Sequence, residues 1–440
     1  MTRLARALLI LAGCTRASAR NPPRPSRVDV TRAVIDAAAP DVAPVEVIDS
    51  SCGHAIPGPL PGRAVVTEHR DEAANARARG LHLTFVGDPS HTITVQWSTR
   101  EVNLSSELRY RREGDRADRV ARGYSFVYAG SDGRRQHRVH LCGLEAGARY
   151  AYAVTGDPNA RGSFVTAPDG PGPVRVLVTG DSRSNPAVWR AIAERAMRER
   201  PDVMIFTGDA VDDGSFHSHW EAFFDAAPAL LASVPAYWID GNHEGINNVT
   251  DAQFAYPPNG DAEHHGRWWS STYGPVKLIG LNDVTLPPLR VIARDETAFL
   301  ERELASVDRA RTPWVITAHH CPLHTTSGGI DNENPARRAW GARFDRYGVD
   351  LDLAGHTHNY QSSRAMLSDE SVTEGARGTR YLTFGGAGAE LYQFRATAPW
   401  VSHQEVTHGY AMLTVDARRA RWAARRLDGT VIEAFEMPTR

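Results

Sequence analysis

The stretch VRVLVTGD, at residues 174–181, is an apolar run that ends in a Gly-Asp pair. Four further segments repeat this pattern: VMIFTGD (203–209), AYWIDGNHE (236–244), WVITAHHCP (314–322) and VDLDLAGHTH (349–358). Continuous apolar runs of this length are typical of buried strands, and helical patterns near 187–200 and 217–228 separate the first three. The alternation predicts an α/β domain, in which ligands bind beyond the carboxyl ends of the strands.

The polar residues at these five strand ends are of the types that bind transition metals. They are Asp181, Asp209, Asn242, one of His319 and His320, His356 and His358. Oxygen and imidazole donors together suit Zn, Mn or Fe. Six donors exceed the ligands of one catalytic zinc ion, and a bridging carboxylate would allow two ions to share them. A single Gly-Asp turn has an ordinary structural explanation, but five such ends in one chain favour a metal site.

Residues 79–168 show a different pattern, in which short strands of alternating polarity are broken by Gly and Asp turns. Examples are LHLTFVG (81–87), TITVQWS (92–98) and RYAYAVTG (149–156). This spacing predicts an antiparallel β-sandwich with Trp97 in its core. A Gly- and Pro-rich linker at 169–173 separates the sandwich from the α/β domain. The sandwich contains no cluster of catalytic residue types, so we expect a structural or substrate-framing role.

The chain begins with a targeting segment. Two arginines precede an apolar run that is too short to span a bilayer, as in a secretory signal. Leu11-Ala12-Gly13-Cys14 resembles the lipobox of bacterial lipoproteins, whose cysteine becomes the lipidated first residue. We therefore expect a signal peptide at 1–13, lipidation at Cys14 and a tether at 14–78. The protein would be exported and anchored by lipid to the bacterial cell envelope, on its periplasmic or cell-surface side. An ordinary signal peptide with a chance cysteine is the alternative.

The composition excludes several classes of protein. The chain has 440 residues, of which 42% are hydrophobic, and its formal net charge is −2. These values are ordinary for a globular protein and give no electrostatic basis for binding nucleic acid. Four cysteines are too few for a disulfide-stapled scaffold. In an oxidising compartment Cys52 and Cys142 are candidates for a disulfide, with two reduced thiols as the alternative.

Together the five motifs resemble those of the calcineurin-like metallophosphoesterase superfamily, and within it the purple acid phosphatases and their bacterial relatives. The similarity covers about residues 79–436. HLTFVGDPSHTITVQWST (82–99) is similar to the opening of that family's fibronectin type III-like N-terminal domain. YGPVKLIGLND (273–283) and YLTFGGAGAELY (381–392) are similar to its later core segments. The resemblance implies a fibronectin-like all-β sandwich at 79–168. A calcineurin-like α/β domain at 172–436 would follow, with two packed sheets flanked by helices.

The resemblance also implies a role for each motif. It assigns Asp181 and His358 to a first metal, Asp209 to the bridge, and Asn242 and His356 to a second metal. The fourth motif requires His-x-Pro, which selects His320 as a further ligand over His319. His243 matches the catalytic histidine, which contacts the substrate. The implied cofactors are two divalent or trivalent ions of Fe, Zn or Mn.

The chain departs from the family at the first metal. Purple enzymes place a metal-binding tyrosine where this sequence has Asp212, and other branches place a histidine where it has Arg183. Asp212 is a candidate ligand, although it is much shorter than tyrosine. Arg183 is a candidate for binding phosphate through its guanidinium fork, with an ion pair to Asp212 or Asp213 as the alternative. The paired histidines downstream of the fourth motif are replaced by Gly329 and Ile330, and His324 is a candidate substitute that would bind phosphate.

The implied activity is hydrolysis of a small phosphate monoester, as in acid phosphatases. A hydroxide bound by two ions about 3.5–4 Å apart would attack phosphorus. His243 would protonate the leaving group or stabilise the transition state. One alternative is a phosphodiesterase or nucleotide pyrophosphatase on the same site. The other is a non-catalytic, surface-anchored binding lipoprotein.

Overall fold

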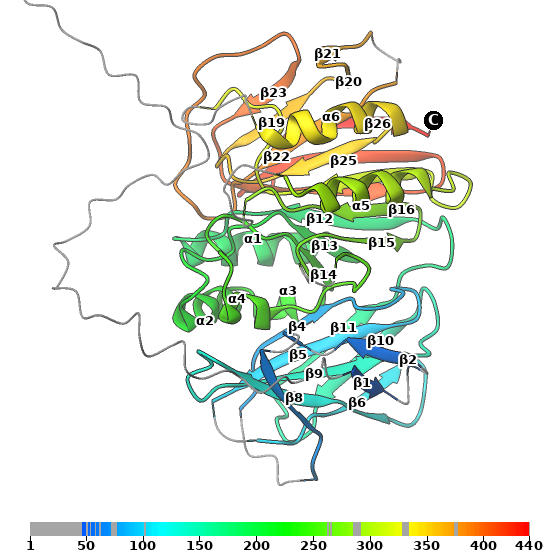
Figure 1. Cartoon of the computed structure of the whole chain (residues 1–440), viewed down its shortest axis with the longest axis vertical. Coiled ribbons are helices and arrows are strands. Elements are labelled where there is room, and N and C mark those ends of the chain that lie inside the picture. Colours follow the sequence, from blue (N-terminus) through cyan, green and yellow to red (C-terminus); the bar gives the residue numbers. More distant parts are fainter. Residues whose placement is uncertain are drawn as a thin grey trace, which may run out of the picture.

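The structure is a computed structural model. It describes residues 46–49, 52, 54–57, 59–60, 63–71, 77–100, 103–261, 264, 266–284, 292–327, 334–373 and 377–439. Figure 1 shows a β-sandwich at one end of the molecule and a larger α/β domain above it. The predicted signal peptide at 1–13, Cys14 and much of the predicted tether lie outside the described residues, as do Gly329 and Ile330. Among the described helices, none has the length and apolar character needed to cross a membrane.

The N-terminal domain consists of two antiparallel sheets. The first contains, in spatial order, β3 (Ala64–Glu68), β8 (Tyr124–Tyr128), β9 (Arg135–Leu141), β5 (Ile93–Thr99) and β4 (Arg79–Thr84). The second contains β11 (Arg161–Val165), β10 (Arg149–Val154), β6 (Glu107–Arg112) and β7 (Arg119–Arg122). Trp97 and Phe126 are fully buried in its core. The predicted all-β domain is confirmed.

The sandwich begins earlier in the chain than residue 79. Strand β3 pairs with β8 along Ala64–Glu68, so these residues are part of a sheet and not of a tether. The predicted tether at 14–78 is therefore too long. Farther toward the N-terminus, β1 (Glu46–Asp49) and β2 (His54–Pro57) form a separate hairpin. A disulfide joins Cys52 to Cys142, directly after β9, with 4.9 Å between their Cα atoms.

The α/β domain contains two mixed sheets. The first, with six strands, has the order β14 (Ala236–Trp238), β13 (Val203–Phe206), β12 (Val174–Thr179), β24 (Gly409–Val415), β25 (Arg419–Arg426) and β26 (Val431–Pro438). The second, with seven strands, has the order β15 (Trp269–Tyr273), β16 (Val276–Gly280), β17 (Trp314–Ala318), β18 (Leu351–Ala354), β22 (Arg380–Phe384), β19 (Tyr360–Ser363) and β23 (Val401–Glu405). β20 (Met366–Leu367) and β21 (Glu370–Ser371) form a short hairpin. The sequence-predicted strands β12, β13 and β14 are parallel, as are β17 and β18.

Helices pack against both sheets. They are α1 (Pro186–Arg198), α2 (His217–Ala226), α3 (Pro228–Leu231), α4 (Asn248–Gln253), α5 (Arg294–Ala305) and α6 (Pro335–Tyr347). The side chain of Asn334 accepts a hydrogen bond from the Ala336 amide at the start of α6, and Gly348 ends this helix with φ +68°. The predicted α/β sandwich flanked by helices is confirmed.

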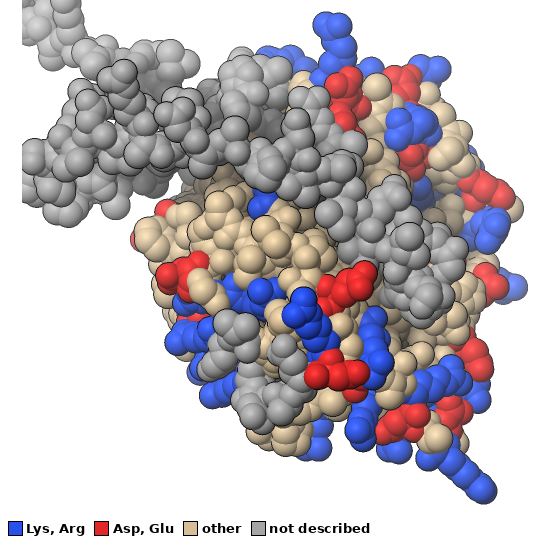
Figure 2. Space-filling view, turned by 60° about the horizontal axis from the view of Figure 1, so that its bottom comes forward, with Lys and Arg blue, Asp and Glu red and all other residues tan. Residues whose placement is uncertain are grey.

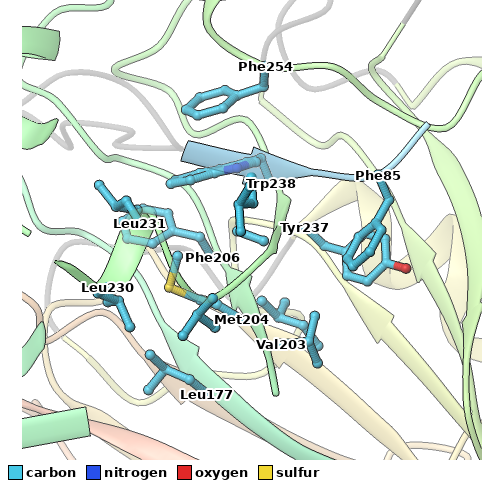
Figure 3. Close-up of a cluster of buried hydrophobic side chains, with 14 of the residues drawn as sticks. Phe85, Leu177, Val203, Met204, Phe206, Leu230, Leu231, Tyr237, Trp238 and Phe254 are labelled. Atoms are coloured by element: carbon cyan, nitrogen blue, oxygen red, sulfur yellow. The ribbon is translucent and has the colours of Figure 1, made fainter. Parts of the chain in front are cut away.

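Aromatic and aliphatic side chains form the core around the six-stranded sheet. Figure 3 shows Phe206 and Trp238, from neighbouring strands, close together, with Phe254 above Trp238 and Leu231 beside Phe206. The rings of Trp238 and Phe254 stack with centroids 4.0 Å apart. Residues of both sheets belong to this one buried cluster, so the two sheets pack face to face. A second cluster joins α5 and α6 to the outer face of the seven-stranded sheet.

Direct contacts tie the sandwich to the α/β domain. The guanidinium of Arg138 donates to the backbone oxygen of Phe254 (2.8 Å), and the hydroxyl of Tyr152 donates to that of Ala232 (2.8 Å). Phe85 packs on Tyr237 across the same boundary, with ring centroids 4.9 Å apart (Figure 3). On the face shown in Figure 2, basic and acidic side chains are interspersed, which gives that face no single sign of charge.

Candidate metal centre

The carboxyl ends of five strands converge on one site. Strands β12, β13 and β14 belong to the six-stranded sheet, and β17 and β18 to the seven-stranded sheet. The loops after them bring together all six predicted ligands: Asp181, Asp209, Asn242, His320, His356 and His358. Asp181, Asp209, His320 and His358 are buried, whereas His356 is partly exposed and Asn242 is exposed, so the site is open to solvent on the side of these two residues.

Three of these residues have a backbone conformation that side chains other than glycine rarely adopt. The φ angles of Asp181, Asp209 and His356 are +59°, +54° and +61°. Such a conformation costs about 1–3 kcal/mol, and it persists only where neighbours hold it. Here the amide of Asp181 donates to the carbonyl of Gly208 (2.9 Å), and the amide of His356 donates to the carboxylate of Asp181 (3.0 Å). The strain aims the donor atoms into the site immediately after each strand.

The first group of ligand atoms comes from Asp181, Asp209 and His358. Their donor atoms all lie within 4.8 Å of one another. Nε2 of His358 is 3.4 Å from Oδ1 of Asp181. The other ring nitrogen of His358, Nδ1, donates to the backbone oxygen of Glu390 (2.6 Å), which leaves Nε2 as the donor atom for a metal.

The second group comes from Asp209, His320 and His356, with Asn242 beside them. Nε2 of His320 lies 3.3 Å from Oδ1 of Asp209 and 3.2 Å from both the Asn242 oxygen and Nδ1 of His356. Nδ1 of His320 donates to the backbone oxygen of Thr207 (2.7 Å), so Nε2 faces the site. Asp209 belongs to both groups, which is the geometry of a bridging carboxylate.

The electrostatics of the site fit a bound cation. Burial raises the pKa of Asp209, but His320 and His243 outweigh burial, so the net pKa is lowered and the carboxylate stays ionised. Burial lowers the pKa of His320, but the carboxylates of Asp209 and Asp181 raise it overall to about 10. Carboxylates that attract a proton so strongly would attract a metal ion in its place. The residues present therefore fit transition-metal ions.

His243 lies at the open side of the site. Its ring is partly exposed, and Nε2 lies 3.8 Å from Oδ2 of Asp209. Nδ1 donates to the backbone oxygen of Asp212 (2.7 Å), while the backbone amide of His243 donates to Oδ1 of Asp209 (3.0 Å). The side chain thus has one ring nitrogen directed at the site while the other is held by the chain.

Arg183 and Asp212 form a charged pair beside the first group. The guanidinium lies 3.5 Å from Oδ2 of Asp209, 3.7 Å from Oδ1 of Asp212 and 3.4 Å from Nε2 of His358. Asp212 accepts hydrogen bonds from the hydroxyl (2.5 Å) and the amide (3.2 Å) of Ser184. The ion pair with Asp212 was one of the two alternatives for Arg183, whereas the contact with Asp209 was not anticipated. In this geometry the Asp212 carboxylate is directed to Ser184 instead of to the metal ligands.

The contacts of His324 are with residues other than the six proposed ligands. Its ring packs on Tyr381 and Trp400, with centroids 4.4 and 5.7 Å away, and its ion-pair neighbour is Asp369 at 3.6 Å. Burial lowers its pKa to about 4. The predicted substitute for the paired histidines is therefore a packing residue. Because His324 is only four residues after His320, the sequence predicts that it lies near the metal ligands. The turn of the chain between them instead directs its ring to Tyr381 and Trp400.

Three contributors to the site were not singled out from the sequence. Glu244 is buried, and its carboxylate accepts from the amides of Asp209 (2.9 Å), Ala210 (2.8 Å) and Gly241 (2.6 Å). The carboxylate of Asp283 accepts hydrogen bonds from the backbone amides of His320 (3.3 Å) and Cys321 (3.0 Å). Tyr392 stacks on His358, with ring centroids 4.0 Å apart. Glu244 lies within a motif and one of its partners, Gly241, is close in sequence, but its other partners and those of Asp283 and Tyr392 are distant in sequence.

Known proteins share both domains of this chain. The model of the calcineurin-like phosphoesterase family matches residues 174–360, and that of the purple acid phosphatase N-terminal domain matches residues 78–166. Acid phosphatase type 7 of Mus musculus is 27% identical over 377 residues, which cover 76% of this chain and 84% of the relative. Purple acid phosphatase 21 of Arabidopsis thaliana is 24% identical, and the matched region covers 79% of this chain and 80% of the relative. The solved structure of purple acid phosphatase PPD1 from yellow lupin (Lupinus luteus) seeds has the same fold. It has a TM-score of 0.72 and 20% identity, and covers 82% of this chain and 74% of that one.

Proposed function

Because the chain is a calcineurin-like metallophosphoesterase with a purple acid phosphatase N-terminal domain, we propose that it hydrolyses phosphate monoesters at a dinuclear metal centre. The observation that carries this proposal is the membership of Asp209 in both ligand groups. A carboxylate shared in this way allows two ions to lie close enough to act on one phosphate group.

Each ion would be held by both oxygen and nitrogen donors. Asp181, Asp209 and His358 would hold the first ion, and Asp209, Asn242, His320 and His356 the second. When bound, such a pair of ions lowers the pKa of a water molecule, so that it attacks phosphorus, and neutralises charge on the phosphate oxygens. The chain's own contribution is to hold the donor atoms in place.

His243 would act as the general acid. Because Nδ1 donates to the carbonyl of Asp212 (2.7 Å), Nε2 is the nitrogen free to transfer a proton to the leaving oxygen. Nε2 lies 3.8 Å from Oδ2 of Asp209, so this nitrogen faces the site. The histidine would then be positioned by its own loop and not by the metals.

Arg183 would bind a phosphate oxygen. Its guanidinium lies between the carboxylates of Asp209 and Asp212, and its side chain is 16% exposed. A planar guanidinium at this place can donate to a phosphate oxygen while it remains paired with Asp212. Its partner Asp212 would thus support the substrate site and would not be a metal ligand.

The lipobox-like Leu11-Ala12-Gly13-Cys14 supports a second part of the proposal, which concerns location. The protein would be exported by a bacterium and held on the cell envelope through lipid on Cys14. Two or more acyl chains suffice for stable anchoring, and the domains would face the periplasm or the medium.

Metal analysis combined with a panel of phosphate esters tests the function. Protein purified without chelators should contain two transition-metal ions per chain and turn over monoesters faster than diesters. Asp209→Ala should lose both ions and the activity. Asp202→Asn, which alters an ion pair with Arg175 (2.9 Å) at the opposite ends of the strands, should lose neither. A preference for diesters would support the phosphodiesterase alternative. Two bound ions without turnover of any ester would support the binding lipoprotein.

A further inference from the structure

A network of buried charged side chains lies directly behind His320. Asp283 follows strand β16, and its carboxylate is fully buried. It accepts hydrogen bonds from the amide of Cys321 (3.0 Å), from the amide of His320 (3.3 Å) and from Nδ1 of His319 (3.0 Å). One carboxylate thus holds three consecutive residues of the turn that carries a proposed metal ligand.

His319 extends the network to a third strand. Its Nε2 lies 3.0 Å from Oδ2 of Asp352 in β18, and neither side chain is more than 1% exposed. The other oxygen of Asp352 accepts from the hydroxyl of Thr317 in β17 (2.6 Å). The imidazole therefore connects the end of β16, through the end of β17, to the interior of β18.

These three strands are neighbours in the seven-stranded sheet, in the order β16, β17, β18. Strand β17 leads into His320, and β18 leads into His356. The network therefore fixes the turn of one proposed second-metal ligand relative to the strand that carries the other. The ring of His320 has its own support, because Nδ1 donates to Thr207 of the opposite sheet. The two supports are complementary, since Thr207 orients the ring and Asp283 holds the backbone.

We propose that Asp283, His319 and Asp352 are positioning residues for the second metal ion. None of the three would contact the ion or the substrate. They would set the position of His320 relative to His356, and with it the affinity for this ion but not for the first. The inference rests on the proposed dinuclear centre and adds the residues that make its second half rigid.

The test is a titration of metal-free protein with Mn²⁺, followed by calorimetry and by metal content after gel filtration. In Asp283→Asn one carboxylate oxygen is replaced by an NH₂ group, which cannot accept the hydrogen bonds that residues 319–321 donate, so at least one of these bonds is lost. Replacing such an outer partner typically weakens metal binding about 10–100-fold. We expect that loss for one of the two ions. The titration should resemble that of Asn242→Ala, which lacks a second-metal ligand, and differ from that of His358→Ala, which lacks a first-metal ligand.

Two further variants keep the result interpretable. Asp352→Asn leaves the contacts of Asp283 with the amides of residues 320 and 321 in place, so it should weaken the same ion by a smaller factor. Glu303→Gln is the matched control, because it removes a half-buried ion pair with Lys277 (2.9 Å) near the opposite end of β16. It should leave both affinities unchanged.

The outcomes separate this inference from the proposed function. Asp283→Asn with unchanged affinities, or with both ions weakened equally, would overturn the positioning role. If Asp283→Asn does not fold, Asp352→Asn decides by the same criterion. Wild-type protein that binds fewer than two ions would instead overturn the dinuclear centre itself.

Discussion

Replacing His243 with alanine tests the proposed general acid most directly. The substitution removes the imidazole and its hydrogen bond to the Asp212 carbonyl. It leaves the backbone amide of residue 243, which donates to Oδ1 of Asp209 (3.0 Å). The carboxylate that bridges the two ligand groups therefore keeps its support, and we expect His243→Ala to retain both ions.

The expected loss of activity depends on the leaving group. General acid catalysis by a positioned side chain contributes about 10²–10⁴ in rate, which corresponds to about 2.7–5.5 kcal/mol. An alkyl phosphate such as glycerol phosphate needs a proton on its leaving oxygen, so its kcat/KM should fall by this factor. Nitrophenyl phosphate releases a stable anion, and its kcat/KM should fall by about tenfold or less.

The assay compares kcat/KM for these two esters in wild type, in His243→Ala and in a control. His219→Ala is a suitable control, because that partly exposed ring contacts the backbone of Asp213 (3.1 Å) and the ring of Phe216 in the adjacent loop, and none of the six proposed ligands. An equal loss for both esters would refute proton transfer and indicate that His243 binds phosphate. A loss of metal along with activity would show that the ring is structural.

Three other properties should follow from the same structure. Iron-loaded protein should not be purple, because Asp212 is directed to Ser184 (2.5 Å) and a carboxylate gives no tyrosinate charge-transfer band. A strong visible band in the wild type would mean that a tyrosine reaches the metal, and Asp212→Tyr should create one. The free energy of unfolding should fall with acidity, because burial, with a smaller contribution from Arg135, lowers the pKa of His137 to about 3. The free energy of unfolding should not depend on His137 above about pH 6.5, and below that pH it should fall by about 1.4 kcal/mol per pH unit, because the unfolded chain takes up a proton that the buried ring does not. Denaturation at pH 7 and at pH 5 measures this fall, and His137→Gln should make it smaller. Cys14→Ser should release the protein from membranes of its host or block its processing, and unchanged partition between membrane and soluble fractions would contradict the anchor.

The positions of the proposed metal ligands could be predicted because they depend on local sequence. A buried strand must be apolar, and the residue where it ends is free to be polar. Asp181 and Asp209 each follow such a run and a glycine, and the structure brings them together. Parallel strands end at the same edge of a sheet, so a list of strand ends approximates a list of neighbours.

The supports of the site could not be predicted, because they bind the backbone of distant segments. Glu244 accepts from the amide of Asp209, 35 residues earlier in the chain. Asp283 accepts from that of Cys321, 38 residues later. Backbone amides leave no signal in the sequence, so a buried carboxylate bound to them cannot be distinguished from any other acidic residue.

Nearness in sequence also misled the prediction in two places. His324 is close to His320 along the chain, but it packs among aromatic rings on Tyr381. Strand β3, AVVTE, has only five residues and none of them is buried, so its short sequence does not distinguish it from the preceding segment that we assigned to the tether. Its place in the sheet depends on pairing with β8, about 60 residues later, which a local pattern does not encode.

The two sheets divide the metal centre by the chemistry of its donors. The six-stranded sheet supplies the oxygen ligands Asp181, Asp209 and Asn242, and the seven-stranded sheet supplies the imidazoles of His320, His356 and His358. Either ion would therefore require both sheets. Each sheet also has one buried carboxylate that binds the amides of its ligand loops: Glu244 holds residues 209, 210 and 241, and Asp283 holds 320 and 321. Because each carboxylate acts on one half of the ligand set, the rigidity of the two halves can be altered separately. Glu244 would act on the bridging ligand and so on both ions, whereas Asp283 would act on the second ion alone.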